Sequence, residues 1–130
     1  MRRLLSFRNT PFVLAGLFAA ALAGIAAAQA VDEVTVVGHH AQKGLNDTVS
    51  YKVGYADLDL RTKEGQDALA DRIKVTAAYV CEKLGEAKQG NSICIDSAVK
   101  DASTAARRAT KAAQESHVAW KAGAPWSPPQ

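Results

Sequence analysis

The chain has 130 residues, a formal net charge of +3 and two cysteines, and this length accommodates one small domain. Three of its sixteen Lys and Arg residues lie within the first ten positions, whereas all thirteen Asp and Glu residues come from Asp32 onward. After residue 30, thirteen cations face thirteen anions. The basic composition of the whole chain therefore gives no reason to expect a nucleic acid partner.

The first thirty residues have the pattern of a cleavable secretory signal peptide. Three arginines within the first eight residues precede an uncharged, Ala- and Leu-rich stretch over 11–28, and the segment closes on Ala28-Gln29-Ala30, an A-x-A cleavage pattern. An uncleaved anchor is the alternative, because the apolar run approaches the ~20 residues that span a bilayer. We predict cleavage after Ala30, a periplasmic or secreted protein, and no stable membrane insertion after cleavage.

Residues 31–47 are predicted to form a flexible N-terminal arm with one β-prone run, Val34 to Val37. The segment from Asp32 to Gly38 is similar to the TonB box of outer-membrane receptors, which adds a strand to a partner's sheet. A simpler hypothesis is that the run pairs with Val49 to Val53 or stays loose. We favour the simpler hypothesis, because short motifs often match by chance.

The spacing of apolar residues changes between Val49 and Leu84, from alternation to a helical period. Val49, Tyr51, Val53 and Tyr55 alternate with polar or small residues, which predicts a strand with one apolar face. From Thr62 the apolar residues recur at spacings of three and four, which predicts a helix that covers this face. These residues are Leu69, Ile73, Ala77, Val80, Cys81 and Leu84.

Capping residues mark both ends of the first predicted helix and the start of the second. Thr62 is the expected N-cap of the first helix, and Gly85 is placed to end it in a left-handed conformation. After a polar loop over 85–90, Asn91 or Ser92 can cap a second helix, whose apolar stripe is mostly alanine and allows another helix to approach closely. The stripe consists of Cys94, Ala98, Ala102, Ala105, Ala109 and Ala112 or Ala113.

Cys81 and Cys94 are predicted to form a disulfide, because an even pair in an oxidising compartment is most simply bonded. A redox-active pair or a pair of metal ligands is the alternative. The twelve-residue gap is no C-x-x-C motif, and no histidine lies near either cysteine in the sequence. The bond would join adjoining ends of two antiparallel helices and stabilise the domain by roughly 3 kcal/mol.

Between about Val49 and Ala106, a Y-A-D-L-D-L segment is followed by a glycine, an R-I-x-x-A-A-x-x-V-C helix and a second cysteine. In this order of motifs the chain resembles the UrcA family of small exported bacterial proteins. This resemblance implies an exported location, this fold and the disulfide, and it implies no catalytic residue, because the family has no established activity. The corresponding motif positions are Tyr55, Asp57, Leu58, Asp59, Leu60, Gly65 and Arg72.

Asp57 and Asp59 are the best candidates for a chemical site, since their carboxylates share one side of an extended segment. Such a pair can bind calcium or share a proton. Calcium needs six to eight oxygens, however, and the D-x-D-x-D-G signature is absent. We favour a structural role, in which one aspartate accepts hydrogen bonds from the backbone at the turn into the helix while Leu58 and Leu60 anchor the strand end.

His39 and His40 are weak candidates for metal ligands, because neighbouring histidines in a loop give at best a loose site. We predict no cofactor and no metal. No H-E-x-x-H, G-x-S-x-G or phosphate-binding glycine motif is present in the sequence, so nothing nominates an enzyme.

The tail, residues 117–130, cannot continue a helix past Gly123 and Pro125. It contains two tryptophans, which either anchor an interface or fold back over the core. We favour folding back for Trp120 and have no preference for Trp126.

The predicted fold is mainly α: a disulfide-stapled antiparallel two-helix hairpin, preceded by one or two short β-strands, in an UrcA-like domain over 48–116. The predicted function is that of a non-enzymatic binding or envelope-stress accessory protein with an envelope protein as partner. The alternatives are a small helical periplasmic enzyme and a metal-sequestering protein. A deep pocket containing Asp57, Asp59 or Arg72 would support the enzyme.

Overall fold

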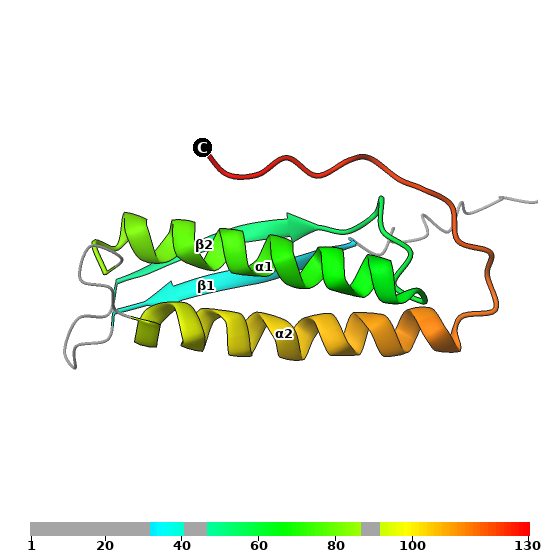
Figure 1. Ribbon diagram of the computed structural model, residues 1–130, viewed down its shortest axis with the longest axis horizontal. Coiled ribbons are helices and arrows are strands. Elements are labelled where there is room, and N and C mark those ends of the chain that lie inside the picture. Colours follow the sequence, from blue (N-terminus) through cyan, green and yellow to red (C-terminus); the bar gives the residue numbers. More distant parts are fainter. Residues whose placement is uncertain (1–31, 41–46, 87–91) are drawn as a thin grey trace, which may run out of the picture.

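The computed structural model describes residues 32–40, 47–86 and 92–130. Its elements in chain order are strands β1 (Glu33–His39) and β2 (Thr48–Gly54) and helices α1 (Lys63–Lys83) and α2 (Ser92–Glu115). Figure 1 shows the two helices side by side, running in opposite directions, with the strands packed against them. The predicted signal peptide, its cleavage site after Ala30 and the Asn91 cap lie outside the described residues.

The two strands form an antiparallel sheet that turns one face towards the helices. Val34 pairs with Val53 and Val36 pairs with Tyr51, so the large apolar residues of the two strands lie on the same face. Alternate residues of β1 are buried, and the residues between them are exposed or half-buried. The simpler hypothesis left open whether the Val34–Val37 run pairs with the next strand or stays loose, and the structure shows that it pairs. Part of the arm that was predicted to be flexible is therefore strand β1, which is longer than this run.

Helix α1 begins and ends where the sequence predicts. Thr62 is the N-cap, and its hydroxyl accepts a hydrogen bond from the Gly65 N–H at 3.1 Å. Gly85 has a φ of 77°, a left-handed conformation that favours glycine. The next residue, Glu86, donates its N–H to the Cys81 carbonyl at 2.9 Å, which satisfies a carbonyl of the last turn.

The two helices cover the sheet unequally. Helix α1 contacts both strands, whereas α2 packs against β1 and α1. The residues of α2 that enter the core after Cys94 are Ala98 and Ala102, whose single methyl groups let the helix backbone come close to β1. Gly38 of β1 is small for a similar reason, since a Cβ there would lie 3.0 Å from side-chain carbons of Val80 and Leu84.

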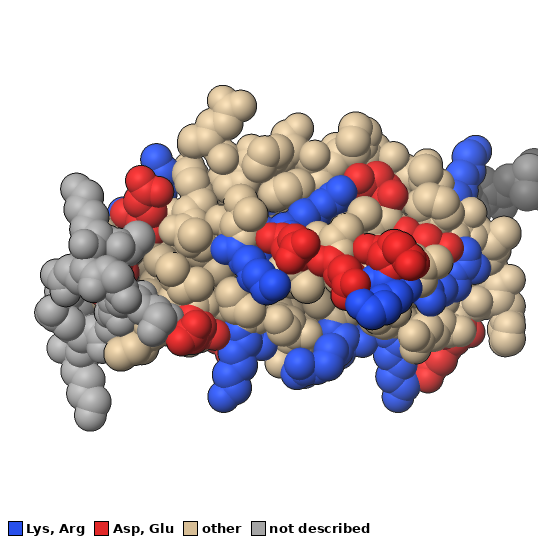
Figure 2. All heavy atoms as spheres, in the orientation of Figure 1, with Lys and Arg blue, Asp and Glu red and all other residues tan. Residues whose placement is uncertain are grey.

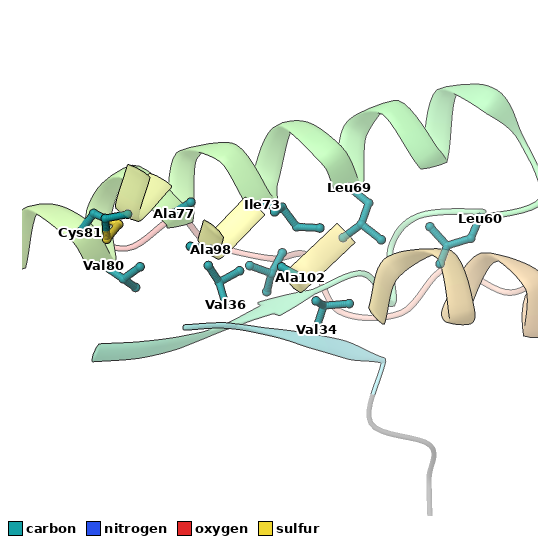
Figure 3. Close-up of a cluster of buried hydrophobic side chains, with 12 residues drawn as sticks. Val34, Val36, Leu60, Leu69, Ile73, Ala77, Val80, Cys81, Ala98 and Ala102 are labelled. Atoms are coloured by element: carbon teal, nitrogen blue, oxygen red, sulfur yellow. A yellow bond between two sulfur atoms is a disulfide. The ribbon is translucent and has the colours of Figure 1, made fainter. Parts of the chain in front are cut away.

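The hydrophobic core runs the length of the molecule between sheet and helices, with Cys81 towards one end and Leu60 towards the other (Figure 3). Twelve apolar residues in it are at most 3% exposed. They are Val34, Val36, Val53, Leu60, Leu69, Ile73, Ala77, Val80, Cys81, Cys94, Ala98 and Ala102. Nine of these twelve residues are alanine, cysteine or valine, so the core contains few large side chains for its length and needs further support.

Cys81 and Cys94 are disulfide-bonded, as predicted, with their Cα atoms 6.0 Å apart. The bond connects the last turn of α1 to the first turn of α2. The mainly helical fold class with preceding strands is therefore confirmed together with the covalent link. Across the described ranges, no helix is long and apolar enough to cross a membrane.

The C-terminal tail folds back beside β2, but through a different tryptophan from the one we expected. Trp120 is 42% exposed, whereas Trp126 is partly buried against the core. The Gly123 N–H donates to the Ala56 carbonyl at 2.9 Å, and a Cβ at Gly123 would lie 2.6 Å from the Ala56 Cβ. This close approach at Gly123 directs the tail so that Trp126, three residues later, reaches the protein body.

We predict that replacing both Cys81 and Cys94 with Ser lowers the free energy of unfolding by about 3 kcal/mol, because the bond restricts the unfolded chain. Urea denaturation followed by circular dichroism measures the loss. Reduced wild-type protein is the control and should unfold at the same urea concentration as the variant. A loss below about 1 kcal/mol would contradict the role given to the bond.

Candidate functional site

The motif residues that follow β2 form the turn that carries the chain into α1. The Leu58 N–H donates to the Tyr55 carbonyl at 2.9 Å, and the Thr62 N–H donates to the Asp59 carbonyl at 3.0 Å. Leu60 is buried in the core and Leu58 packs against it. The two leucines therefore anchor the strand end, as expected from the sequence.

Arg72 of α1 ties this turn to the sheet. Its guanidinium donates to both carboxylate oxygens of Asp57, at 2.7 and 2.6 Å, and to the Gly54 carbonyl at 2.8 Å. The ring of Trp126 lies against the same guanidinium, with its centroid 5.2 Å from Cζ. A single side chain thus connects α1, the end of β2, the motif turn and the tail.

The electrostatics of this cluster keep Asp57 ionised. The hydrogen bonds from Arg72 lower the pKa of the Asp57 carboxyl below its ordinary value and outweigh the opposing effect of desolvation. Both side chains are largely shielded, with 21% of Asp57 and 17% of Arg72 exposed. Asp57 is therefore held as a carboxylate in an ion pair, an arrangement suited to structure and unsuited to donating a proton.

Asp59 belongs to a separate pair. Its carboxylate accepts hydrogen bonds from the Arg61 backbone N–H at 3.1 Å and from the Arg61 guanidinium at 2.9 Å. These bonds lower the pKa of Asp59 as well. Since Asp57 and Asp59 bind different arginines, they share neither a proton nor a cation, and the structural role predicted for an aspartate at this turn is what the geometry supports.

Gly65 lets the first turn of α1 lie close to the motif turn. A Cβ at Gly65 would lie 2.1 Å from the Asp59 carbonyl oxygen and 2.7 Å from its carbon, far inside contact distance. The first turn of α1 therefore packs directly on the motif turn, and the Thr62 hydroxyl also donates to the Asp59 carbonyl at 2.8 Å. Only glycine leaves room for this approach.

The two candidate metal ligands do not converge. Val36 and Gly38 of β1 are buried, so strand alternation places His39, the last residue of β1, on the opposite and exposed face of the sheet, and His40 follows the strand. His40 Nδ1 lies 2.8 Å from a carboxylate oxygen of Glu86. Within the described parts of the chain, no group of three or more His, Cys, Asp or Glu side chains is arranged to hold a metal ion.

A groove of about 380 Å³ separates α1 from α2 in the half of the molecule away from the disulfide. From α1 it is lined by Gln66, Leu69, Ala70 and Ile73. From α2 it is lined by Ser103, Ala106, Arg107, Thr110, Lys111 and Gln114. Leu69 and Ile73 belong to the core, so the floor of the groove is continuous with it.

The groove brings together two cations and no acid. Arg107 and Lys111 line it, and none of the lining residues carries a carboxylate. Arg107 donates to the Thr104 hydroxyl at 3.1 Å, and the nearest acid to Lys111 is Glu115, 3.8 Å away on the same helix. Figure 2 shows basic side chains along the middle of the margin that α2 occupies, with acidic side chains at both ends of it, whereas acidic and basic side chains are mixed over α1.

Another hollow, of about 480 Å³, lies between the motif turn and the tail. Asp59 and Arg61 line it, together with Asp32, but the two motif side chains are paired with each other. Much of its wall is tail, in which residues 116–121 are exposed. The larger hollow is therefore less well defined than the groove, whose walls are two helices.

Sequence reasoning found the residues of the turn but missed the groove. The four lining positions of α1 follow the spacing i, i+3, i+4, i+7, and those of α2 continue the same rule over three turns. This periodicity was present in the sequence. On each helix it marks a stripe at the edge of the core face, which includes Leu69 and Ile73 of the core and the small residues Ala70, Ser103 and Ala106.

No family model, curated protein or solved structure matches the chain. Its function is therefore inferred from the geometry of the turn and of the groove.

We predict that Gly65→Ala destabilises the protein by more than about 2 kcal/mol, because the new methyl group collides with the Asp59 carbonyl. Gly54→Ala is the matched control, since a Cβ there meets only Trp126 carbons at 3.7 Å or more and should cost under about 1 kcal/mol. Thermal and urea unfolding compare the two. Equal stabilities for the two variants would contradict the packing described here.

The Asp57–Arg72 pair should make stability depend on pH. Because the folded-state pKa of Asp57 is lowered, its contribution is present above the unfolded value of about 3.9 and is lost as pH falls through the folded pKa. Asp57→Asn should cost about 1–2 kcal/mol at pH 7 and flatten the acid limb of the stability curve. The control Asp59→Asn should change that limb less. An unchanged limb in Asp57→Asn would disprove the assignment.

Proposed function

We propose that this chain is an exported, non-enzymatic binding protein of UrcA type, and that the groove between α1 and α2 is its binding site. The observation that carries the proposal is a contrast between the two candidate sites. The motif carboxylates are already engaged with Arg72 and Arg61, whereas the groove presents apolar floor and cations without a carboxylate among its lining residues.

Several features support export and the family likeness. A disulfide is typical of proteins that fold in an oxidising compartment, and the first thirty residues have the pattern of a signal peptide. The residues on which the likeness to the UrcA family rests lie together here: Tyr55 to Leu60 form the turn, Gly65 packs on it and Arg72 binds it. The helical hairpin with its disulfide then builds the groove.

The size and lining of the groove suit a ligand site. Small-molecule sites in proteins enclose roughly 300–1,000 Å³ and combine an apolar lining with a few polar groups that orient the ligand. At about 380 Å³, with Leu69, Ile73 and two alanines beside two cations, the groove meets this description near its lower limit.

The alternative of a small envelope enzyme would use the hollow that Asp59 and Arg61 line. We rank it below the binding protein, because neither residue is free to act while each is the other's ion-pair partner. Metal sequestration is ranked lower still, since His39 is exposed on the sheet while His40 contacts Glu86, and neither belongs to a group of three potential metal ligands within the described ranges.

Native mass spectrometry of protein recovered from the envelope fraction of its host tests the proposal. Ala70→Trp should fill the groove and abolish any bound species, since Ala70 is an exposed lining residue of α1. Ala78→Trp is the matched control, because Ala78 is exposed on the same helix outside the groove, and it should retain the bound species.

The same spectra test export. An oxidised chain that begins at Val31 and carries a bound species in the wild type and in Ala78→Trp, but not in Ala70→Trp, is the expected result. A bare monomer for all three proteins, or a species that persists in Ala70→Trp, would contradict binding in the groove. A chain that retains residues 1–30 would contradict cleavage.

A further inference from the structure

The groove has a polar end and an apolar end. The disulfide joins Cys81 to Cys94, and α1 and α2 run in opposite directions (Figure 1), so each step back along α1 corresponds to a step forward along α2. Ile73 therefore lies near the level of Ala102, and Gln66 lies near the level of residue 109. Thr110, Lys111 and Gln114 consequently lie towards the Gln66 end of the groove, and Arg107 lies near the level of Leu69, in its middle.

The opposite end is apolar. Ile73 and Ser103 lie at this end, and Leu69 and Ala106 continue the hydrocarbon lining from there to the level of Arg107. Burying a hydrocarbon chain against this floor would remove apolar surface of both ligand and protein from water, at about 25 cal/mol per Å². A free inorganic anion would leave this apolar surface exposed to water, and an uncharged hydrocarbon would leave the two cations without an anionic partner.

Charge complementarity identifies the head of the ligand. Arg107 and Lys111 are one helical turn apart on α2, so both can face one anionic group. Among the described residues, these two cations form one ion pair with a carboxylate, that of Lys111 with Glu115 at 3.8 Å. A carboxylate head bound by both cations would gain charge-assisted hydrogen bonds that these side chains lack at present.

The length of the groove fits a single chain. Its α2 lining runs from Ser103 to Gln114, which spans about 16 Å at 1.5 Å per residue, and about 12 Å of this length lies between Ser103 and Lys111. A groove of about 380 Å³ is at the low end for ligand sites and is too small for a two-chain lipid with its head group.

Resting on the proposed binding role, we propose that the groove binds a single-chain carboxylic acid amphiphile, with the carboxylate at Arg107 and Lys111 and the hydrocarbon chain along Leu69, Ala106 and Ile73. The recognition is by charge at one end and by burial at the other. Binding requires no change in the sheet or the disulfide.

Isothermal titration of the purified, oxidised protein with laurate, below its micelle concentration, tests this assignment. The double variant Arg107→Gln/Lys111→Gln should bind laurate about tenfold more weakly, since two exposed charge contacts are lost. The matched control Lys100→Gln/Arg108→Gln removes the same charge from exposed positions of α2 outside the groove. Its affinity should stay within about twofold of the wild type.

Two further arms define the ligand. Dodecyltrimethylammonium carries the same chain with a positive head and should bind at least about tenfold more weakly than laurate. Ala70→Trp should abolish laurate binding while Ala78→Trp preserves it. Equal affinity for the two amphiphiles, or equal loss in the charge variant and its control, would overturn the assignment.

Vesicles of anionic phosphatidylglycerol test whether the basic side chains of α2 bind a membrane surface instead. Vesicle binding that Ala70→Trp leaves intact, without laurate binding, would assign the basic margin of α2 to a membrane surface and overturn the inference. If laurate fails to bind but the native spectra show a species that Ala70→Trp removes, the ligand class is wrong and the binding role stands. If Ala70→Trp affects neither measurement, both proposals fall.

Discussion

The contact between Gly65 and the Asp59 carbonyl determines how α1 leaves the sheet. Because no side chain separates them, the first turn of the helix lies directly on the turn that follows β2. The helix axis is then directed back over both strands, which brings Arg72 within hydrogen-bonding distance of Asp57 and the Gly54 carbonyl. The core, the tail contact and one wall of the groove all depend on that direction.

Other small residues also allow segments of the backbone to approach each other closely. A two-stranded sheet is marginal alone, and here it is stabilised by burying one face under two helices. Ala98 and Ala102 let α2 approach β1, and Gly38 lets the end of α1 approach the same strand. The tail approaches Ala56 in the same manner through Gly123. The fold thus gains contact area by bringing backbones together, since few large side chains are available.

Local patterns in the sequence predicted most of this architecture. The period of three and four, the Thr62 cap and the left-handed Gly85 depend on neighbouring residues, so they are visible in the chain itself. The ion pair between Arg72 and Asp57 spans fifteen positions and follows from how the turn packs on the helix, which no local rule supplies. The tail was predicted to fold back, but the choice of tryptophan depended on the close approach at Gly123.

The groove was missed for a related reason: its shape arises where two helix faces meet, and neither face alone indicates a hollow. Its chemistry is equally a property of the pair, since α1 supplies the apolar floor and α2 supplies the cations. A residue pattern can name the face of a helix, whereas the distance between two faces depends on every contact that orients the helices.

The position of the disulfide gives the helix pair an asymmetric stiffness. The covalent bond fixes the separation of α1 and α2 at Cys81 and Cys94, whereas Gln66 lies fifteen residues away along α1, about 22 Å at 1.5 Å per residue. A rotation of a few degrees about the bonded end therefore moves the far ends most. The groove lies at the end of the helix pair away from the disulfide, where packing rather than a covalent bond sets the distance between α1 and α2.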